Sequence, residues 1–337
     1  MRAENVTSDR TTSRRAFAGG LAALTGLAAT PALALSQVTG TRLPPTEDRT
    51  ALLSNLLTRM SAKTNINGHA GSQFVLDTGA GRTAIAADLA TALALPAGPS
   101  ILVHGVTSAE IAPTVKIARL SFGGRRFNDV YAAVFPREML AADGLLGLDV
   151  LSRFELQFDM VRRTMLLRPS GPDIIQFGRA FGTSSRIRRG DCSRIRTGEF
   201  GQMILLNARA DGVPVECFVD SGAQYSIGNM ALHRALGGRG GTTIQRALTP
   251  VYGVTGQTLM AERGSVGMLD INRQRLGPTS LLFADLHAFG ALDLIEAPAL
   301  LLGADVLYRF RTVSLDFGRS RMSFTGLRRA IAGPTRS

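Results

Sequence analysis

The sequence contains few of the residues on which several protein classes depend. Its 337 residues include two cysteines, four histidines and no tryptophan. Two cysteines are too few for a disulfide-dense scaffold or for a zinc site with four thiolate ligands. The histidines are scattered and never approach the H-E-x-x-H pattern, which argues against a zinc hydrolase. We therefore expect no metal and no other cofactor.

The composition also argues against two non-globular classes. Hydrophobic residues make up 45% of the chain, which is enough for packed cores and disfavours disorder. The 37 glycines follow no three-residue period, so they indicate tight turns rather than a collagen helix. At about 100–200 residues per domain, the length favours two modest domains.

The charge is strongly one-sided, with 38 basic against 26 acidic residues and a formal net charge of +12. Lys63 and Lys116 are the only lysines, so the excess is arginine. Its one cluster, from Arg186 to Arg196, we interpret as a solvated linker; a patch for anionic envelope polymers or acidic substrates is the alternative. Neither interleaved aromatic residues nor a binding motif accompanies the cluster, so no nucleic-acid partner is expected.

The N-terminus has the pattern of an export signal. Arg14 and Arg15 precede an apolar run at 18–29, and Ala32-Leu33-Ala34 has the form of a cleavage site. Paired arginines in this position favour the twin-arginine (Tat) route. The apolar run is short and interrupted by glycine, which disfavours a membrane anchor. We expect cleavage of residues 1–34 and a periplasmic or secreted mature chain without a stable membrane anchor.

Three sequence blocks occur twice, in the same order. In first and second copies they are F-V-L-D-T-G-A at 74–80 and C-F-V-D-S-G-A at 217–223, H-G-V-T at 104–107 and Y-G-V-T at 252–255, and G-L-L-G-L-D-V-L at 144–151 and L-L-L-G-A-D-V-L at 300–307. Both third blocks continue as x-Arg-Phe, at Phe154 and Phe310. Collinear repeats of this kind indicate two homologous lobes in tandem.

Within each copy the residue pattern is mostly that of β-strands. Short apolar runs end at the aspartates, as buried strands do when they enter tight turns. Asn67-Gly68 and Asp211-Gly212 predict hairpin turns. The helical signals are short and lie at 86–95, 150–154, 230–236 and 306–310. The sequence therefore predicts an all-β fold with minor helix, in which two homologous β lobes are related by a pseudo-twofold axis.

These patterns divide the chain into successive regions. In order, we expect the signal peptide at 1–34, an N-terminal extension or short prosegment at 35–59, the first lobe at 60–169, a linker at 170–195, the second lobe at 196–328 and a tail at 329–337. The linker is rich in Gly, Pro, Ser and Arg. The stretch from Gln37 to Met60 has two interpretations, a short prosegment or a strand-and-helix extension of the first lobe.

The two D-[TS]-G-A blocks carry the predicted chemistry. If the lobes associate about a pseudo-twofold axis, Asp77 and Asp220 come within hydrogen-bond distance. Two like charges about 4 Å apart repel by about 4 kcal/mol at an effective dielectric constant near 20. One carboxyl therefore keeps its proton, while the ionised partner accepts a proton from water. The alternatives are simple turn capping and a phosphate-binding loop at 79–81, but Gln224 stands in the second copy where the first has Gly81.

The residues that follow each aspartate have predicted supporting roles. The Thr78 and Ser221 hydroxyls can form hydrogen bonds across the lobe interface and fix the geometry of the pair. Gly79 and Gly222 allow backbone N–H groups to approach the carboxylates, which a Cβ atom would hinder.

With these motifs, the chain resembles the pepsin/retropepsin superfamily of aspartic proteases, specifically bacterial members with retropepsin-sized lobes. The resemblance covers about 60–170 and 196–327, and it implies that Asp77 and Asp220 are catalytic. It also implies structural elements behind the catalytic loops and flaps that close over substrate. The first are Leu145, Leu146, Gly147, Leu301, Leu302 and Gly303, and the second are His104, Gly105, Tyr252 and Gly253. One departure is that the first flap carries His104, where pepsin-type enzymes have a tyrosine.

The sequence therefore predicts a monomeric aspartic endopeptidase that acts on peptide or protein substrates. The alternative is a non-catalytic peptide- or cell-envelope-binding protein that retains the bilobal cleft. Such a protein would be expected to lose a carboxylate or a motif glycine, and this chain keeps them all.

The two cysteines leave two possibilities open. Cys192 and Cys217 could form a disulfide in an oxidising compartment, in a loop whose closure would contribute about 3–4 kcal/mol. A buried free thiol at Cys217 is the interpretation we favour.

Replacing Arg14 and Arg15 together by lysine is expected to leave the precursor in the cytoplasm, because the Tat route selects the arginine pair. Cell fractionation followed by immunoblotting measures this. A double lysine variant at Arg2 and Arg10 is the control and should be exported normally. Normal export of the Arg14/Arg15 variant would contradict the assignment.

Overall fold

The computed structural model describes residues 48–51, 53–54, 59–170, 194–198, 201–237, 242–319 and 321–328. The predicted signal peptide at 1–34, the predicted tail and most of the predicted linker, including Cys192, lie outside the described residues. No helix in the described part of the chain is both long and apolar enough to cross a membrane.

The first lobe is built on one mixed sheet. In sheet order its strands are β2 (Leu53–Ser54), β3 (Met60–Ile66), β4 (His69–Leu76), β9 (Gly144–Leu146), β5 (Ala84–Ala86), β8 (Arg125–Phe135), β7 (Ala109–Phe122) and β6 (Ala97–His104). Three short helices interrupt them, α1 (Ala87–Ala92), α2 (Arg137–Leu140) and α3 (Leu148–Leu151). Strands β4 and β9 run parallel, as do β5 and β8.

The second lobe repeats this order of strands. It contains β12 (Arg194–Gly198), β13 (Gly201–Ala210), β14 (Val213–Val219), β21 (Ala299–Leu302), β15 (Ile227–Gly228), β20 (Thr279–Phe283), β17 (Thr258–Val266) and β16 (Thr243–Tyr252). An added hairpin, β18 (Leu269–Ile271) with β19 (Gln274–Leu276), pairs with β13. The helices of the second lobe are α4 (Met230–Leu236), α5 (His287–Ala291) and α6 (Ala304–Leu307).

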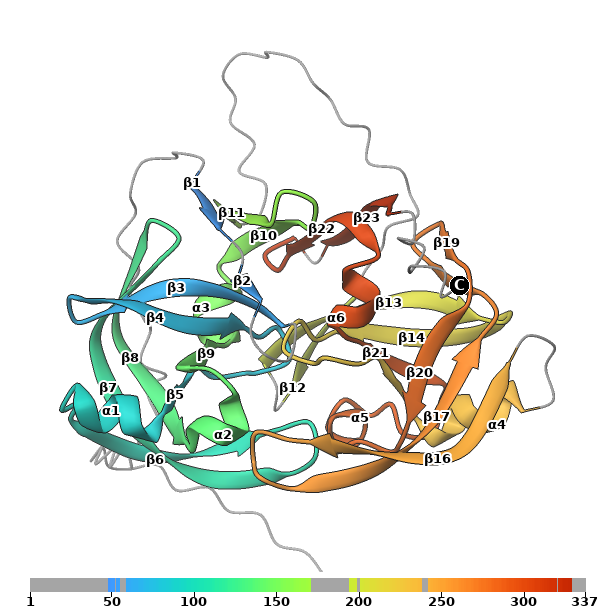
Figure 1. Cartoon of the computed structure of the whole chain (residues 1–337), viewed down its shortest axis with the longest axis horizontal. Coiled ribbons are helices and arrows are strands. Elements are labelled where there is room, and N and C mark those ends of the chain that lie inside the picture. The colour runs from blue at the N-terminus through green and yellow to red at the C-terminus, as the bar shows by residue number, and fades with distance from the viewer. Residues whose placement is uncertain are drawn as a thin grey trace, which may run out of the picture. The chain divides into compact units, whose positions relative to one another are not determined.

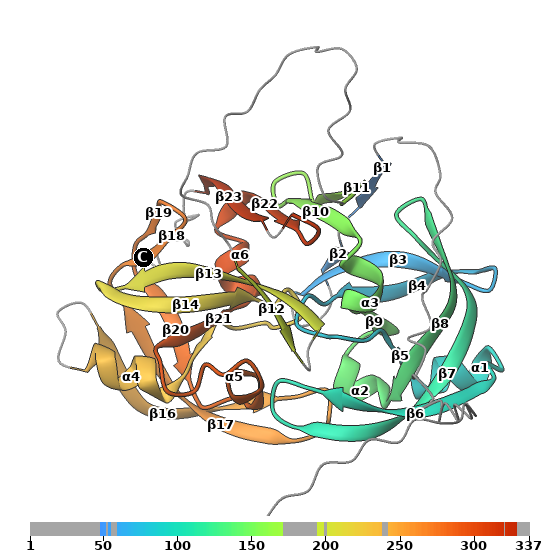
Figure 2. The same ribbon diagram turned by 180° about the vertical axis from the view of Figure 1, so that it is seen from behind.

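A third sheet joins the two repeats. Its order is β1 (Asp48–Ala51), β11 (Thr164–Pro169), β10 (Phe154–Asp159), β22 (Phe310–Asp316) and β23 (Arg321–Leu327). Strands β10 and β22 pair antiparallel, so strands of the first repeat lie beside strands of the second in both views (Figure 1, Figure 2). The repeated x-Arg-Phe element begins both central strands, and both of its phenylalanines are buried.

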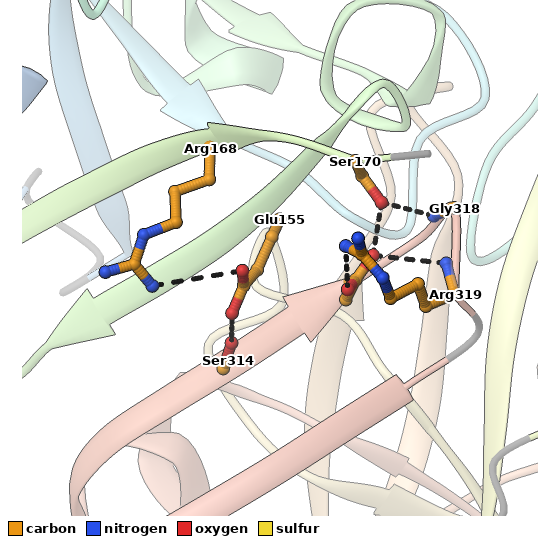
Figure 3. Close-up of polar contacts among 7 residues, drawn as sticks. Glu155, Arg168, Ser170, Ser314, Gly318 and Arg319 are labelled. Carbon is orange, nitrogen blue, oxygen red and sulfur yellow. Dashed lines mark hydrogen bonds and ion pairs between the residues drawn. The ribbon is translucent and has the colours of Figure 1, made fainter. Parts of the chain in front are cut away.

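Polar contacts join strand ends of this third sheet. The Ser170 hydroxyl donates a hydrogen bond to the Asp316 carboxylate, and Gly318 N donates to Ser170 Oγ at 2.8 Å (Figure 3). Asp316 also accepts from Arg319 N at 3.1 Å and pairs with Arg319 Nη1 at 3.2 Å. Nearby, Ser314 Oγ donates to Glu155 Oε1 at 2.8 Å. The end of the first lobe is thus bound to the β22–β23 turn of the second.

The structure confirms the prediction of a mostly β fold with short helices. The Asn67-Gly68 and Asp211-Gly212 dipeptides form the expected hairpin turns, and all four residues have positive φ, between 44° and 100°. The pseudo-twofold axis stays a prediction.

Two local features differ from the predictions made from the sequence. The helical turns predicted at 150–154 and 306–310 begin two residues earlier in the structure. Each helix begins directly after the motif glycine, Gly147 or Gly303. Helices α2 and α5 were not predicted at all; each is a single turn, too short to show helical periodicity. In the extension before Met60, the described segments are strands, β1 and β2, and no helix occurs among them.

Ser170→Ala is expected to lower the free energy of unfolding by about 1–2 kcal/mol, because it removes a hydrogen bond to a buried carboxylate. Urea denaturation measures the change. Ser280→Ala is the matched control, since Ser280 is exposed. Equal stability of the two variants would contradict a stabilising role for the Ser170 contact.

Candidate active site

Each motif aspartate lies at the end of a buried strand. Asp77 follows β4 and Asp220 follows β14. Asp77 N donates to Leu146 O at 3.0 Å, and Asp220 N donates to Leu302 O at the same distance. The neighbouring residues of β9 and β21, Leu145 and Leu301, are buried as well. The two repeated Leu-Leu-Gly elements therefore lie beside the strands that position the aspartates.

The two aspartate loops meet through reciprocal hydrogen bonds. Thr78 Oγ1 donates to Val219 O at 2.9 Å, and Ser221 Oγ donates to Leu76 O at 2.5 Å. Each hydroxyl also accepts a backbone N–H from the other loop, Ser221 N to Thr78 Oγ1 at 3.0 Å and Thr78 N to Ser221 Oγ at 3.2 Å. Both side chains are buried. Each loop is thus bound to the strand end of the other repeat.

The motif glycines allow the aspartates to pack closely. Gly79 N donates to Asp77 Oδ1 at 2.9 Å, and Gly222 N donates to Asp220 Oδ1 at 2.8 Å. A Cβ on Gly79 would overlap the Asp220 carboxylate, and a Cβ on Gly222 would overlap that of Asp77. Each carboxylate therefore lies against the glycine of the other loop, and no side chain fits at either glycine.

Burial and mutual interaction make the two carboxyls unequal. Asp77 is 7% exposed and Asp220 2%. Burial, followed by the Asp77 charge, raises the pKa of Asp220 well above its usual range. Burial also raises the pKa of Asp77, but the Arg59 charge and a hydrogen bond from Gly79 N oppose that rise. The two carboxyls titrate as a coupled pair, in which the pKa of Asp220 is the more strongly raised.

Comparison with known protein families gives a match to the segment that contains the Asp77 loop. Residues 62–153 match the model of the family described as gag-polyprotein putative aspartyl protease. This segment is similar to that family. It contains Asp77, the β6–β7 hairpin and the first Leu-Leu-Gly element. No curated protein matches the chain.

Behind Asp77, the matched segment contains a polar clamp that was not predicted from the sequence. Thr83 Oγ1 donates to Asp149 Oδ1 at 2.8 Å and accepts from Gly147 N at 3.2 Å. Thr83 N also donates to the Asp149 carboxylate, at 3.0 Å. Burial raises the pKa of Asp149, and these hydrogen bonds oppose the rise. The clamp ties the residue after β9 to the chain that leaves the Asp77 loop.

The second lobe has the same clamp. Ser226 Oγ donates to Asp305 Oδ1 at 2.7 Å and accepts from Gly303 N at 2.9 Å. The signal was present in the sequence, since an aspartate follows the motif glycine by two residues in both copies of the third repeated block.

The tips of the two predicted flaps contact each other. They are the turns between β6 and β7 and between β16 and β17, and these hairpins converge in both ribbon views (Figure 1, Figure 2). Ser108 Oγ lies 2.7 Å from Thr255 Oγ1, and Thr107 Oγ1 lies 3.4 Å from the same atom. A Cβ on Gly253 would overlap the Thr107 hydroxyl, and one on Gly105 would lie 3.0 Å from Thr255 Cγ2. The repeated G-V-T block thus forms a tip-to-tip contact.

The valine of each tip lies against the other lobe. Val254 packs on a buried apolar cluster of the first lobe that includes Phe135 and Leu145. Val106 O accepts a hydrogen bond from Ala288 N of α5 in the second lobe, at 3.4 Å. These exchanged contacts close the two hairpins over the same region.

The two aromatic residues predicted for the flaps have different positions. The His104 ring stacks on that of His287 at the start of α5, with 11° between the ring planes and 3.2 Å between Nδ1 and Nε2. Tyr252 is 74% exposed. The structure thus brings Gly105 and Gly253 into the contact between the flap tips and His104 against His287 of α5, while the Tyr252 side chain faces solvent.

Cys217 has a free thiol that is buried on β14, and burial raises its pKa. The described residues contain no group of three or more His, Cys, Asp or Glu side chains placed to hold a metal ion.

Asp220→Asn is expected to raise the melting temperature at pH 7 and to change it little at pH 3. A carboxyl whose pKa is raised by folding destabilises the protein when it ionises. That cost is absent below the unfolded-state pKa of about 4, grows as the pH rises and is complete above the folded-state pKa. The amide oxygen can still accept from Gly222 N and Ala223 N.

Thermal denaturation at pH 3, 5 and 7 measures this effect. Asp129→Asn is the control for a change of charge at an exposed site, where Asp129 pairs with Lys116 at 2.8 Å. A gain in melting temperature that is equal at pH 3 and pH 7 would show that ionisation of Asp220 is not its cause.

Proposed function

We propose that the protein is an aspartic endopeptidase that hydrolyses peptide bonds with a water molecule activated between Asp77 and Asp220. One observation carries the proposal: two buried carboxyls from corresponding loops of the two repeats lie against each other's glycine. The match of residues 62–153 to an aspartyl protease family supports the same chemistry.

In the proposed reaction the two aspartates have opposite roles. Asp77, whose pKa is the less raised, is the carboxylate that accepts a proton from water. Asp220, whose pKa is raised further, donates a hydrogen bond to the scissile carbonyl oxygen and so makes its carbon more electrophilic. As water attacks the carbonyl carbon, one of its protons passes to Asp77 and the Asp220 proton passes to the carbonyl oxygen, which gives a tetrahedral diol. Asp77 then gives its proton to the leaving nitrogen, the C–N bond breaks, and a diol hydroxyl returns a proton to Asp220. The dyad ends with one proton, as it began.

The rigid contacts around the dyad support this assignment. The Thr78–Ser221 hydrogen bonds and the two clamps hold both loops with buried groups, so little reorganisation is needed when charge moves between the carboxyls. Each carboxyl is oriented by the backbone N–H of its own loop.

The flap contacts suggest how a substrate would enter. The tips touch through the Ser108 and Thr255 hydroxyls and through exchanged valines, contacts that can separate without disturbing the dyad loops. We propose that the two hairpins part to admit an extended peptide and close over it, which excludes water from the reaction.

Assembly and location belong to the same proposal. Both D-[TS]-G loops come from one chain, so a monomer contains the whole proposed site. A Tat signal would deliver the folded protein to the periplasm or the medium, with peptides or proteins there as substrates.

Asp77→Asn and Asp220→Asn are each expected to reduce kcat by about 10²–10⁴-fold or more, because an amide cannot exchange a proton as the mechanism requires. The double variant should be scarcely worse than either single one, since residues that act as one unit are strongly non-additive. Hydrolysis of a diverse peptide library by the mature chain, from pH 3 to pH 8, measures this.

The Asp129→Asn variant is the control and should retain full activity. Near-normal activity of either dyad variant would refute the dyad. Binding of peptides without hydrolysis by the wild type at every pH would instead favour the non-catalytic peptide- or envelope-binding protein.

A further inference from the structure

Arg59, which immediately precedes β3, is a buried cation that the proposed mechanism does not use. It is 5% exposed. Arginine is rarely buried this far unless its charge is compensated, because removing a guanidinium from water is costly. The partners of Arg59 therefore indicate why an arginine occupies this position.

The guanidinium joins the two halves of the site. Nη1 donates to Gly222 O at 3.4 Å, and Nη2 donates to the carbonyl of Leu140, the last residue of α2 in the first lobe. Gly222 is also the residue whose N–H donates to Asp220 Oδ1. Arg59 thus holds the carbonyl of the same residue whose amide orients the second aspartate.

The Arg59 charge also acts on the dyad. Burial lowers the pKa of Arg59, while the charges of Asp77 and then Asp220 raise it. In return, Arg59 lowers the pKa of Asp77. The other carboxyls near the loops, Asp149 and Asp305, accept hydrogen bonds from the hydroxyls of their clamps. Among the groups of the described residues that shift the pKa of Asp77, Arg59 is the positively charged one.

The position that corresponds to Arg59 in the second repeat is not an arginine. Ser61 and Leu205 occupy corresponding places, opposite Val75 of β4 and opposite Phe218 of β14. Counting back two residues from each gives Arg59 in the first repeat and Met203 in the second. The second repeat thus has an uncharged residue of similar length at the corresponding position.

We propose that Arg59 is a positioning residue of the dyad: its guanidinium holds the Asp220 loop through Gly222 and places a fixed positive charge beside Asp77. The inference rests on the proposed function, since it concerns the same pair of carboxyls. It explains how two loops of nearly identical sequence acquire different roles. The positive charge favours the carboxylate at Asp77, and the proton remains on Asp220.

Arg59→Met tests the charge by installing the residue of the second repeat. The acid limb of the pH profile of kcat/KM is expected to move to higher pH by about one unit or more, because an opposite charge beside a carboxyl lowers its pKa by about 1–3 units. Arg59→Lys keeps the charge but cannot bond both carbonyls in the same way. It should leave the acid limb near its wild-type position while kcat falls.

Arg125→Met is the matched control. Arg125 is also 5% exposed, at the start of β8, and is not among the groups that shift the pKa of either aspartate. Its variant should keep the wild-type pH profile. A uniform loss of activity in Arg59→Met, with an unshifted acid limb, would show a structural role only and would overturn the proposal.

A second measurement does not require hydrolysis. The melting temperature of Arg59→Met relative to wild type should fall as the pH rises from 3 to 8, because the lost attraction exists only when the dyad is ionised. In an Asp77→Asn,Asp220→Asn background, where neither carboxyl can ionise, this dependence on pH should largely vanish. A difference that is constant with pH would overturn the proposal even if the wild type hydrolyses no peptide, an outcome that would refute the proposed function separately.

Discussion

The reciprocal hydrogen bonds between Thr78 and Ser221 are the interaction on which the rest of the site depends. Each hydroxyl spans from its own loop to the strand end of the other repeat, so neither loop is complete without its partner. Because both groups are buried, losing one would leave backbone groups without partners in a dry environment. This contact brings two aspartates together that would otherwise repel each other.

The structure surrounds this repulsive pair with features that the two repeats share. Strands β9 and β21 each run parallel to the strand that ends at an aspartate, and they support the aspartate backbones. The Thr83–Asp149 and Ser226–Asp305 clamps hold the chain behind each loop. The third sheet then joins the repeats through β10 and β22. Duplication provides two equal halves, and Arg59 with its counterpart Met203 marks where they differ. That difference is the physical basis on which we assign unequal roles to equal carboxyls.

Much of this arrangement could be predicted from the sequence because the residues of the candidate site lie in the repeated blocks. The D-[TS]-G pairs indicated a carboxylate dyad, and the G-V-T blocks indicated paired hairpins. The clamps were not predicted because their hydroxyl residues, Thr83 and Ser226, are of different types and lie outside the repeated blocks. Arg59 was not predicted because it lies outside the three repeated blocks, and only its hydrogen bond to Gly222 O shows what it contacts.

The sequence by itself determined the mostly β character, the tandem repeat, the hairpin turns and the identity of the two aspartates, because these depend on local pattern and on comparison of the chain with itself. The tertiary structure decided which groups touch across the repeats: the exchanged flap valines, the His104–His287 stack and the Arg59 contacts. Burial and the distance between charges have no signature in residue order. They exist only once strands far apart in the chain are packed together, and they set which carboxyl holds the proton.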